Sequence, residues 1–278
     1  MYTLVKNLIP NKLFLKIKYY KIFKKKLNLK NPINFNEKIN YLKIWDDTQI
    51  KTNLQDKLLV KEIVANLIGE EYIIKTIKIL DISLPFEQQI GSFNNFVIKN
   101  NFESGIVFFF EENKLFDYKE VQKQILESYS NKFYMHGREL HYKRIPKKTF
   151  VEQLLTDHSN ILDYKFYCFD GQPRFLHIDR DRYSSHKRSF YDMDWNKIEN
   201  FTLEYPYDKK MLEMPKNFEK MKEIAATLSK GFKFARVDLY NHLGKIYFGE
   251  ITFHPESGFG KFSDESYNLL MGELIKHR

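Results

Sequence analysis

The 278-residue sequence contains one cysteine, Cys168, so no disulfide can form within the chain. Scarce cysteine suits a reducing compartment, and we expect a cytoplasmic protein. Cys168 lies in the apolar-rich run YKFYCF, which predicts a buried structural thiol rather than a nucleophile. Long apolar runs are also lacking, since the longest, 106–110, is far too short to span a bilayer. Lysines interrupt the apolar residues near the start of the chain, which is unlike a secretory signal peptide.

Acidic residues are absent from positions 1–30, although nine of the 45 basic residues lie there. These nine are Lys6, Lys12, Lys16, Lys18, Lys21, Lys24, Lys25, Lys26 and Lys30. The other 36 basic residues balance the 36 acidic ones, so the whole net charge of +9 comes from this segment. Because large apolar residues lie between the lysines, the segment is typical of peripheral contact with an anionic membrane, here the inner membrane face.

The alternative for residues 1–30 is a helix that buries Leu13, Ile17 and Phe23 on the protein and solvates its lysines. No nucleic-acid motif or second basic patch follows in the sequence, so we expect no nucleic-acid partner.

Glycine and proline are sparse, and no linker rich in either divides the chain. We expect Asn36 to cap the first helix after the basic segment and Gly69 to end the second. The periodicity predicts helices over 35–45, 53–67, 118–129 and 215–232, and strands over 72–79, 93–99, 106–110, 149–155, 163–169, 173–178, 234–240 and 245–253. Hairpins with interleaved helices predict an α+β fold.

The stretch FARVDLYNHLGKIYFGEITFHPESGF, at 234–259, reads as two strands joined by a turn, with Arg236, Asp238, Glu250 and Thr252 at alternating positions. Pairing of the strands would place a guanidinium and two carboxylates on one face. Such carboxylates bind Mg²⁺ or Mn²⁺, or act as an acid–base pair, or form a structural salt bridge. The neighbouring arginine favours a substrate that develops negative charge, such as a phosphate.

These residues carry a resemblance. RVDLY…GKIYFGEITFHPESGF resembles the C-terminal signature of ATP-grasp ligases, in which an R-x-D strand precedes a strand of the form E-[IV]-N-x-x-P-G. Upstream, QDKLLVKEIVANLIGEEY resembles the opening of the ATP-grasp domain, and FVIKNNFESG resembles its lysine strand and phosphate loop. FVEQLLTD resembles the adenine hinge, and DYKFYCFDGQPRFLHIDRDR resembles the strand pair that follows the hinge.

All these motifs occur in the family's order, between about 56 and 260. With NPINFNEKINYLKIW and SKGFKFARVDLY, the pattern looks closest to the TupA-like ATP-grasp family, which is named for teichuronopeptide biosynthesis and associated with bacterial surface-polysaccharide loci. The resemblance implies an ATP-grasp fold of two α/β lobes clasping ATP. We expect a basic helical segment over 1–55 and an ATP-grasp domain over 56–278, with a small lobe at about 72–150 and a large lobe at about 151–278.

The resemblance also implies roles for individual residues. Lys57 and Lys99 would contact the ATP phosphates, and Lys99 would act in catalysis together with Arg236. A loop of Asn101, Ser104 and Gly105 would cover the phosphates. The adenine would lie beside Glu152, Gln153 and Leu155, and the ribose near Asp163 and Lys165. Asp238 would bind one Mg²⁺ and Glu250 would bridge two, with Mn²⁺ as an alternative ion, while Arg236 would hold the acceptor carboxylate or acyl phosphate.

Two departures from the family pattern stand out. The phosphate loop NNFESG has one glycine, where many family loops are glycine-rich. Thr252 stands where the last metal ligand is usually asparagine, and a hydroxyl is a poorer magnesium ligand than an amide oxygen. His254 follows on the same strand face. It is either an additional metal ligand or a packed histidine.

The activity implied by the resemblance is ADP-forming ligation of a carboxylate to an amine through an acyl phosphate. The expected partners are ATP and a small-molecule or glycan-linked carboxylate, such as a uronic acid or an amino acid, with an amine. Two rival interpretations stay open. One is a glycosyltransferase, whose D-x-D metal motif has a literal match at 192–194, although that match reads as a loop. The other is a degenerate module that binds nucleotide without turnover.

Overall fold

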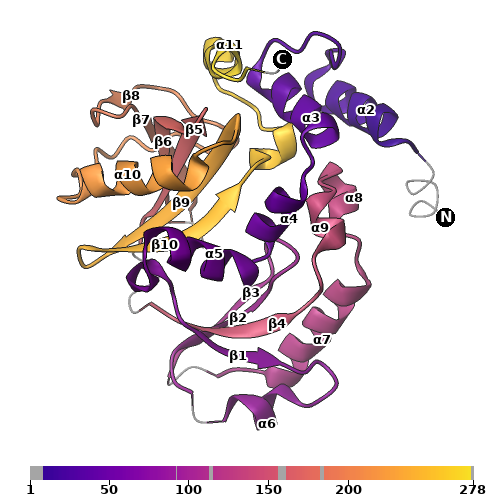
Figure 1. The fold of residues 1–278 in the computed structure, drawn as a ribbon, viewed down its shortest axis with the longest axis vertical. Coiled ribbons are helices and arrows are strands. Elements are labelled where there is room, and N and C mark those ends of the chain that lie inside the picture. Colours follow the sequence, from indigo (N-terminus) through magenta and orange to yellow (C-terminus); the bar gives the residue numbers. More distant parts are fainter. Residues whose placement is uncertain (1–8, 92, 113–114, 156–160, 182–184, 277–278) are drawn as a thin grey trace.

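The computed structural model describes residues 9–91, 93–112, 115–155, 161–181 and 185–276. Within these ranges the chain forms two antiparallel sheets with helices packed around them, which confirms the predicted α+β class (Figure 1). None of the helices in these ranges combines the length and apolar character that spanning a bilayer requires.

The four-stranded sheet has the strand order β1-β4-β2-β3. Its strands are β1 (Thr76–Leu80), β2 (Phe96–Asn100), β3 (Val107–Phe110) and β4 (Thr149–Gln153). Helices α6 (Phe86–Ile90) and α7 (Tyr118–Ser130) pack on it, and Phe86, Ile98, Val121, Ile125 and Val151 share the resulting core.

The six-stranded sheet has the order β10-β9-β5-β6-β7-β8. Its strands are β5 (Asp163–Phe169), β6 (Gln172–Arg180), β7 (Lys187–Tyr191), β8 (Lys197–Ile198), β9 (Phe234–His242) and β10 (Lys245–Thr252). Helix α10 (Phe218–Ser229) covers one face, and α5 (Leu59–Ile68) joins the same core. On the other face, α3 (Phe35–Trp45) and α11 (Glu265–Glu273) cover only the aromatic part, where Phe35 packs on Tyr167, Phe169 and Phe234.

The remaining helices lie between and beside the two sheets. They are α2 (Asn11–Phe23), α4 (Gln49–Gln55), η1 (Glu70–Tyr72), α8 (Tyr134–Gly137), α9 (His141–Arg144) and η3 (Pro255–Gly258). Figure 1 shows α4 and α5 between the six-stranded sheet and the four-stranded sheet.

Two predictions about helix ends were wrong. The cap of α3 is Asn34, whose side chain accepts the N–H of Glu37 at 2.9 Å, while Asn36 lies inside the helix and donates to Gly260 O at 2.8 Å. The helix predicted over 53–67 is divided into α4 and α5, because the Asp56 carboxylate accepts the N–H groups of Leu58 and Leu59. Gly69 does follow the last residue of α5.

The hairpin of β9 and β10 contains a bulge that decides which residues face the same way. Phe248 pairs with Leu239, whereas Glu250 pairs with Asp238, so the register shifts by one residue at Gly249. Without that shift, Phe248 and Glu250 would lie on the same face of the strand. The bulge therefore sends Phe248 into the core under α10 and turns Glu250 to the opposite face, beside Asp238.

Candidate active site

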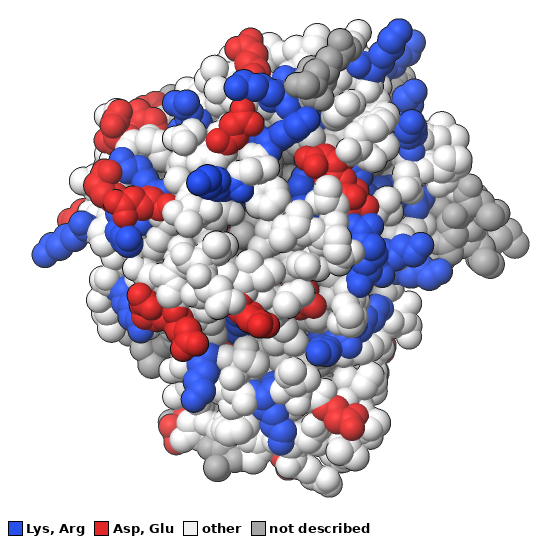
Figure 2. Space-filling model, viewed as in Figure 1, with Lys and Arg blue, Asp and Glu red and all other residues white. Residues whose placement is uncertain are grey.

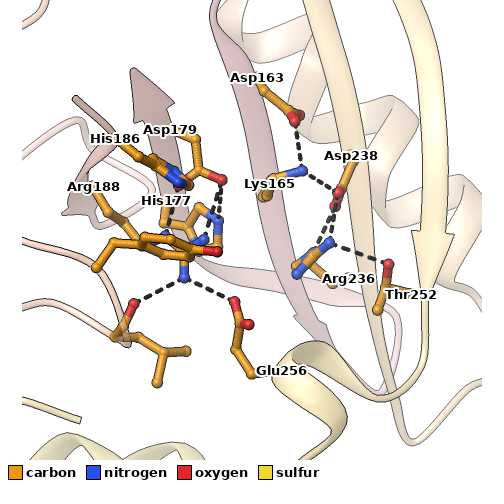
Figure 3. Close-up of polar contacts among 12 residues, drawn as sticks. Asp163, Lys165, His177, Asp179, His186, Arg188, Arg236, Asp238, Thr252 and Glu256 are labelled. Atoms are coloured by element: carbon orange, nitrogen blue, oxygen red, sulfur yellow. Dashed lines mark hydrogen bonds and ion pairs between the residues drawn. The ribbon is translucent and has the colours of Figure 1, made fainter. Parts of the chain in front are cut away.

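A row of mostly buried charged side chains crosses the face of the six-stranded sheet that lies opposite α10. Cross-strand register places Thr252 opposite Arg236 and Glu250 opposite Asp238. The row continues through Lys165, which lies between Asp238 and His177, to Asp179 and Arg188. Figure 3 shows the members of the row other than Glu250, from β5, β6, β7, β9 and β10, gathered on one side of the sheet. The predicted face of Arg236, Asp238, Glu250 and Thr252 is thus confirmed.

Asp238 is bonded through both of its carboxylate oxygens. Arg236 Nε donates to one of its oxygens at 2.8 Å and Arg236 Nη2 to the other at 2.7 Å, a bidentate pair (Figure 3). Lys165 Nζ bonds Asp238 as well, and lies 2.6 Å from Asp163 Oδ2. Burial works to lower the pKa of Arg236, but the pairing with Asp238 outweighs burial and raises that pKa well above its usual value.

Glu250 is the carboxylate in this row that reaches open space. Its side chain is 40% exposed, and Oε1 lies 3.3 Å from Arg236 Nη2. Burial works to raise the pKa of Glu250, but the charges of Lys165, Arg236 and Lys57 outweigh it and lower the pKa, so the carboxylate is ionised at neutral pH. The hydroxyl of Thr252 accepts from Arg236 Nη2 at 3.2 Å.

A cavity of about 320 Å³ opens between the two sheets, a size suited to a small ligand. Nine of the predicted site residues line it: Lys57, Lys99, Ser104, Gly105, Glu152, Gln153, Leu155, Asp163 and Glu250. Apolar side chains, including Ile74, Val97 and Leu154, line it too. The cavity therefore offers apolar walls, several ammonium groups and one carboxylate that opens from the charged row.

The lysine ammonium groups that line the cavity are bound to a carboxylate or a main-chain carbonyl. Glu152 pairs with Lys99 through one oxygen and with Lys61 through the other. Burial works to raise the pKa of Glu152, but the two lysine charges outweigh it and lower the pKa. Lys57 donates to Glu103 O, and burial lowers the pKa of Lys57 against the attraction of Glu250. Lys61 and Glu103 were not among the sequence predictions, although Lys61 lies on the α5 segment that the opening motif covers.

The other predicted residues do not line the cavity. Arg236, Asp238, Thr252 and Lys165 lie behind Glu250 in the charged row. The expected contact of Asn101 with the ATP phosphates is not available in this structure. Its N–H donates to Lys148 O at 3.0 Å, and its side-chain amide donates to Asp56 and Pro146. Asn101 thus ties the start of α5 to the segment before β4, and has no N–H left for a phosphate.

The main chain matters at two of the cavity residues. Gly105 has φ +99°, a conformation that favours glycine, so the single glycine of NNFESG lies where the loop requires it. The N–H of Gln153 donates to Lys75 O at 3.0 Å, so a contact from Gln153 to an adenine would use its carbonyl.

The family model of the TupA-like ATPgrasp family matches residues 37–276. The chain belongs to this family. A comparison with curated proteins finds no match.

Several solved ligases resemble this ATP-grasp chain at low identity. D-alanine–D-alanine ligase from Bacillus anthracis is 15% identical with a TM-score of 0.43, covering 87% of this chain and 69% of that one. The corresponding ligase from Helicobacter pylori is 14% identical with a TM-score of 0.44, covering 87% and 68%. L-amino acid ligase from Bacillus licheniformis is 12% identical with a TM-score of 0.45, and the match covers 80% of this chain but 49% of that one.

A second buried ionic cluster extends the row of this ATP-grasp protein across β6 and β7. Arg188 Nε and Nη2 donate to the two oxygens of Asp179 at 2.7 and 3.1 Å, and Arg188 Nη1 lies 3.0 Å from Glu256 Oε1 (Figure 3). His186 Nε2 lies 3.0 Å from Asp179 Oδ1. Sequence reasoning missed this cluster, although the alternation of His177 and Asp179 at the end of a predicted strand was a usable signal.

Three remaining sequence features have structural explanations. The D-x-D match lies in a turn after β7, where Asp192 Oδ1 accepts the N–H groups of Asp194 and Asn196 at 2.9 and 2.8 Å. Cys168 is fully buried, and burial raises the pKa of its thiol to about 12, so the prediction of a structural thiol is confirmed. His254 is also buried, beside Glu139 and His141 rather than beside Asp238.

Proposed function

We propose that this ATP-grasp protein is an ADP-forming ligase that joins a carboxylate to an amine. The observation that carries the proposal is the cavity between the sheets, which places Lys57 and Lys99 opposite Glu250 at the edge of the Arg236–Asp238 pair. Cationic groups for phosphates and a carboxylate for a metal thus share one site. ATP-dependent ligation of carboxylates to amines is the general chemistry of the superfamily in which the family model lies.

ATP would occupy the cavity with its phosphates toward Glu250. Lys57 and Lys99 would bind the phosphates, and the main chain of Ser104 and Gly105 would cover them. The adenine would lie against Val97 and Leu154, with polar contacts from Glu152, the Gln153 carbonyl and the main chain of Leu155. Asp163 would lie near the ribose, and Lys165 would hold Asp163 and Asp238 in place.

The donor set fits Mg²⁺, because that ion binds proteins through one or two carboxylates and completes its shell with water and substrate phosphates. Glu250 would hold it first, since its side chain opens into the cavity. The oxygens of Asp238 already accept bonds from Arg236 and Lys165, so Asp238 would become a metal ligand by sharing an oxygen between these groups and the ion. Thr252 would contribute least. We propose two Mg²⁺ ions, with Mn²⁺ able to replace them. The ions would neutralise the phosphates during transfer.

The chemistry requires positioning and charge neutralisation, with no covalent enzyme intermediate. An oxygen of the substrate carboxylate attacks the γ-phosphorus of ATP, the bond from that phosphorus to ADP breaks, and an acyl phosphate forms. The amine nitrogen then attacks the acyl carbon, phosphate leaves, and the nitrogen loses a proton to give the amide. Arg236 would hold the substrate carboxylate and then the acyl phosphate through a guanidinium nitrogen that the Asp238 pair does not use, once substrate reaches past Glu250.

We propose that the carboxylate belongs to a uronic acid or an amino acid of bacterial capsule or cell-surface polysaccharide, in line with the family's association. Measuring ADP release over a panel of uronic acids and amino acids, each with a set of amines, would identify the pair. One observation keeps a non-catalytic nucleotide-binding module as a second candidate: Arg236 and Lys165 already bond both oxygens of Asp238.

Nucleotide binding can be tested before any substrate is known. A ligand that binds only the folded state stabilises it by ~2.7 kcal/mol at one hundred times its Kd. We therefore expect millimolar Mg-ATP to raise the melting temperature, and the Lys99→Met variant to lose most of that increase. If Mg-ATP leaves the melting temperature unchanged while a UDP-sugar raises it, the glycosyltransferase interpretation replaces the ligase.

Helix α2 supports a peripheral contact with an anionic membrane face. Leu15 and Tyr19 pack beneath the helix, against Phe259, whereas Leu13, Ile17 and Tyr20 are 49%, 41% and 55% exposed. The alternative is confirmed in part, because α2 does pack one apolar side on the protein and Phe23 is partly buried there, but it is wrong for Leu13 and Ile17. Basic side chains predominate on the side of the molecule where α2 lies (Figure 2). We propose that this exposed face and its lysines bind an anionic lipid surface.

We expect the protein to co-sediment with anionic vesicles at low salt and to be released at high salt. Each lysine near an anionic leaflet contributes roughly 1 kcal/mol, and salt screens that attraction beyond ~8 Å at physiological ionic strength. Ile17→Asp should weaken binding, while Leu67→Asp, at a leucine on α5 that is more exposed than Ile17, should not. Deleting the segment is no clean test, because Leu15 and Tyr19 are core residues. Binding that Ile17→Asp leaves unchanged would refute the proposed surface.

A further inference from the structure

Three side chains that can ligate a metal converge beyond the end of β10. His254 follows that strand, Glu139 lies between α8 and α9, and His141 is the first residue of α9. One potential ligand atom from each residue lies within 4.8 Å of the other two. His141 and His254 are 1% and 3% exposed, and the Glu139 side chain is 12% exposed.

Three of the four imidazole nitrogens of this cluster lack a hydrogen-bond partner in the described part of the chain. Among the described residues, neither nitrogen of His254 nor Nε2 of His141 has a hydrogen-bond partner, although all three atoms are buried. Buried polar atoms are nearly always paired, because an unpaired one keeps the full cost of leaving water. Three unpaired nitrogens in one place point to a partner from outside the chain.

The distances fit a shared cation better than a hydrogen bond. His254 Nδ1 lies 3.6 Å from Glu139 Oε2, which is too long for a hydrogen bond. Two ligands at 2.0–2.1 Å from a tetrahedral ion lie roughly 3.4 Å apart. The centres of the His141 and His254 rings are 5.2 Å apart, so both rings can reach one ion between them.

A second layer of bonds orients the carboxylate. The Ser257 hydroxyl donates to Glu139 Oε1, which leaves Oε2 toward His254. The buried Lys43 ammonium donates to Gly137 O at 2.8 Å and to Ser257 O, and so fixes the segments on either side. A Cβ on Gly137 would lie 2.5 Å from Ser257 Oγ, so glycine permits this close approach. Metal ligands are typically supported by such outer bonds.

We propose that Glu139, His141 and His254 bind one divalent transition-metal ion of the Zn²⁺ type, leaving one position for water or a substrate oxygen. Two imidazoles and a carboxylate suit Zn²⁺, whereas Mg²⁺ prefers oxygen ligands, so this site is chemically distinct from the Asp238–Glu250 site. The ion would tie the segment between α8 and α9 to the end of β10. It therefore links the residues before β4 to the strand that carries Glu250.

Zinc binding to the full chain tests the proposal. The metal-free protein is titrated with Zn²⁺ in saturating Mg²⁺, so that the carboxylates of the charged row are occupied. We expect one equivalent to bind and the melting temperature to rise, and Co²⁺ to give the visible absorbance of a low-coordinate site. No increase in melting temperature, with less than stoichiometric binding, would overturn the proposal.

Variants decide where the ion lies. Glu139→Gln and His254→Gln should each weaken zinc binding on the order of 100-fold or more, and Ser257→Ala by ~10-fold, because Ser257 only orients a ligand. Two control variants should still bind one equivalent of zinc. They are His136→Gln, at an exposed histidine nearby, and Glu250→Gln. Circular dichroism shows whether each variant is folded. If folded Glu139→Gln and His254→Gln both keep zinc with unchanged affinity, the ion binds elsewhere and the proposal is wrong.

Discussion

Glu250→Gln is expected to reduce ATP-dependent turnover by at least about 1,000-fold, equivalent to ~4 kcal/mol of lost transition-state stabilisation. The substitution keeps the size of the side chain and removes the charge that opens into the cavity beside Lys57 and Arg236. Because the side chain is partly exposed and lies at the edge of its cluster, the fold should remain intact. The measurement is ADP release with the substrate pair identified by the panel, alongside a thermal melt.

The control is Glu223→Gln on α10, which removes an equally charged side chain from a surface pair with Lys220. Such pairs contribute about 0–1 kcal/mol, so its turnover should be unchanged within twofold. Asp238→Asn should resemble Glu250→Gln, whereas Thr252→Ala should cost much less because a hydroxyl is a weak ligand. Near-normal ligation by Glu250→Gln would refute the metal assignment. Nucleotide binding that survives without turnover in the unmodified protein would favour the non-catalytic module.

Local patterns in the sequence predicted eight of the ten strands in the described residues, missing β7 and β8, and they also predicted the face of the charged row. Alternation along 234–240 and 245–253 predicted that Arg236, Asp238, Glu250 and Thr252 would share a face, and the register of β9 and β10 confirms it. That outcome depends on a bulge that alternation alone does not show, because an unbroken ladder would place Phe248 on the same face as Glu250. The glycine between them was the available signal.

Contacts made by tertiary packing were outside the reach of local patterns. Lys61 pairs with Glu152 because α5 lies near the end of β4, and no spacing along the chain predicts that meeting. Glu139 and His254 are brought together in the same way, from positions far apart in sequence. Asn101 shows the opposite error, since motif position suggested a phosphate ligand while the folded chain uses its amide to join α5 to the segment before β4.

The Gly249→Val variant is expected to have a lower free energy of unfolding and a turnover reduced by at least about 100-fold. The added side chain crowds the bulge that aligns Glu250 with Asp238. A Cβ at this position would lie 3.0 Å from the carbonyl oxygen of Asp238 and 3.2 Å from the Tyr240 ring. Crowding of this kind costs about 1–3 kcal/mol of unfolding free energy. A displacement of ~1 Å at a catalytic group is enough to reduce the rate 100-fold.

Gly244→Ala in the same hairpin separates lost stability from lost alignment. Gly244 has φ +78° and open space where a Cβ would lie, so alanine there costs about 1–2 kcal/mol through its backbone conformation alone. Both variants should therefore shift the urea midpoint, but Gly244→Ala should keep its turnover because the β9–β10 register at Glu250 is untouched. Comparable turnover in the two variants at matched stability would show that the bulge at Gly249 is not what positions Glu250.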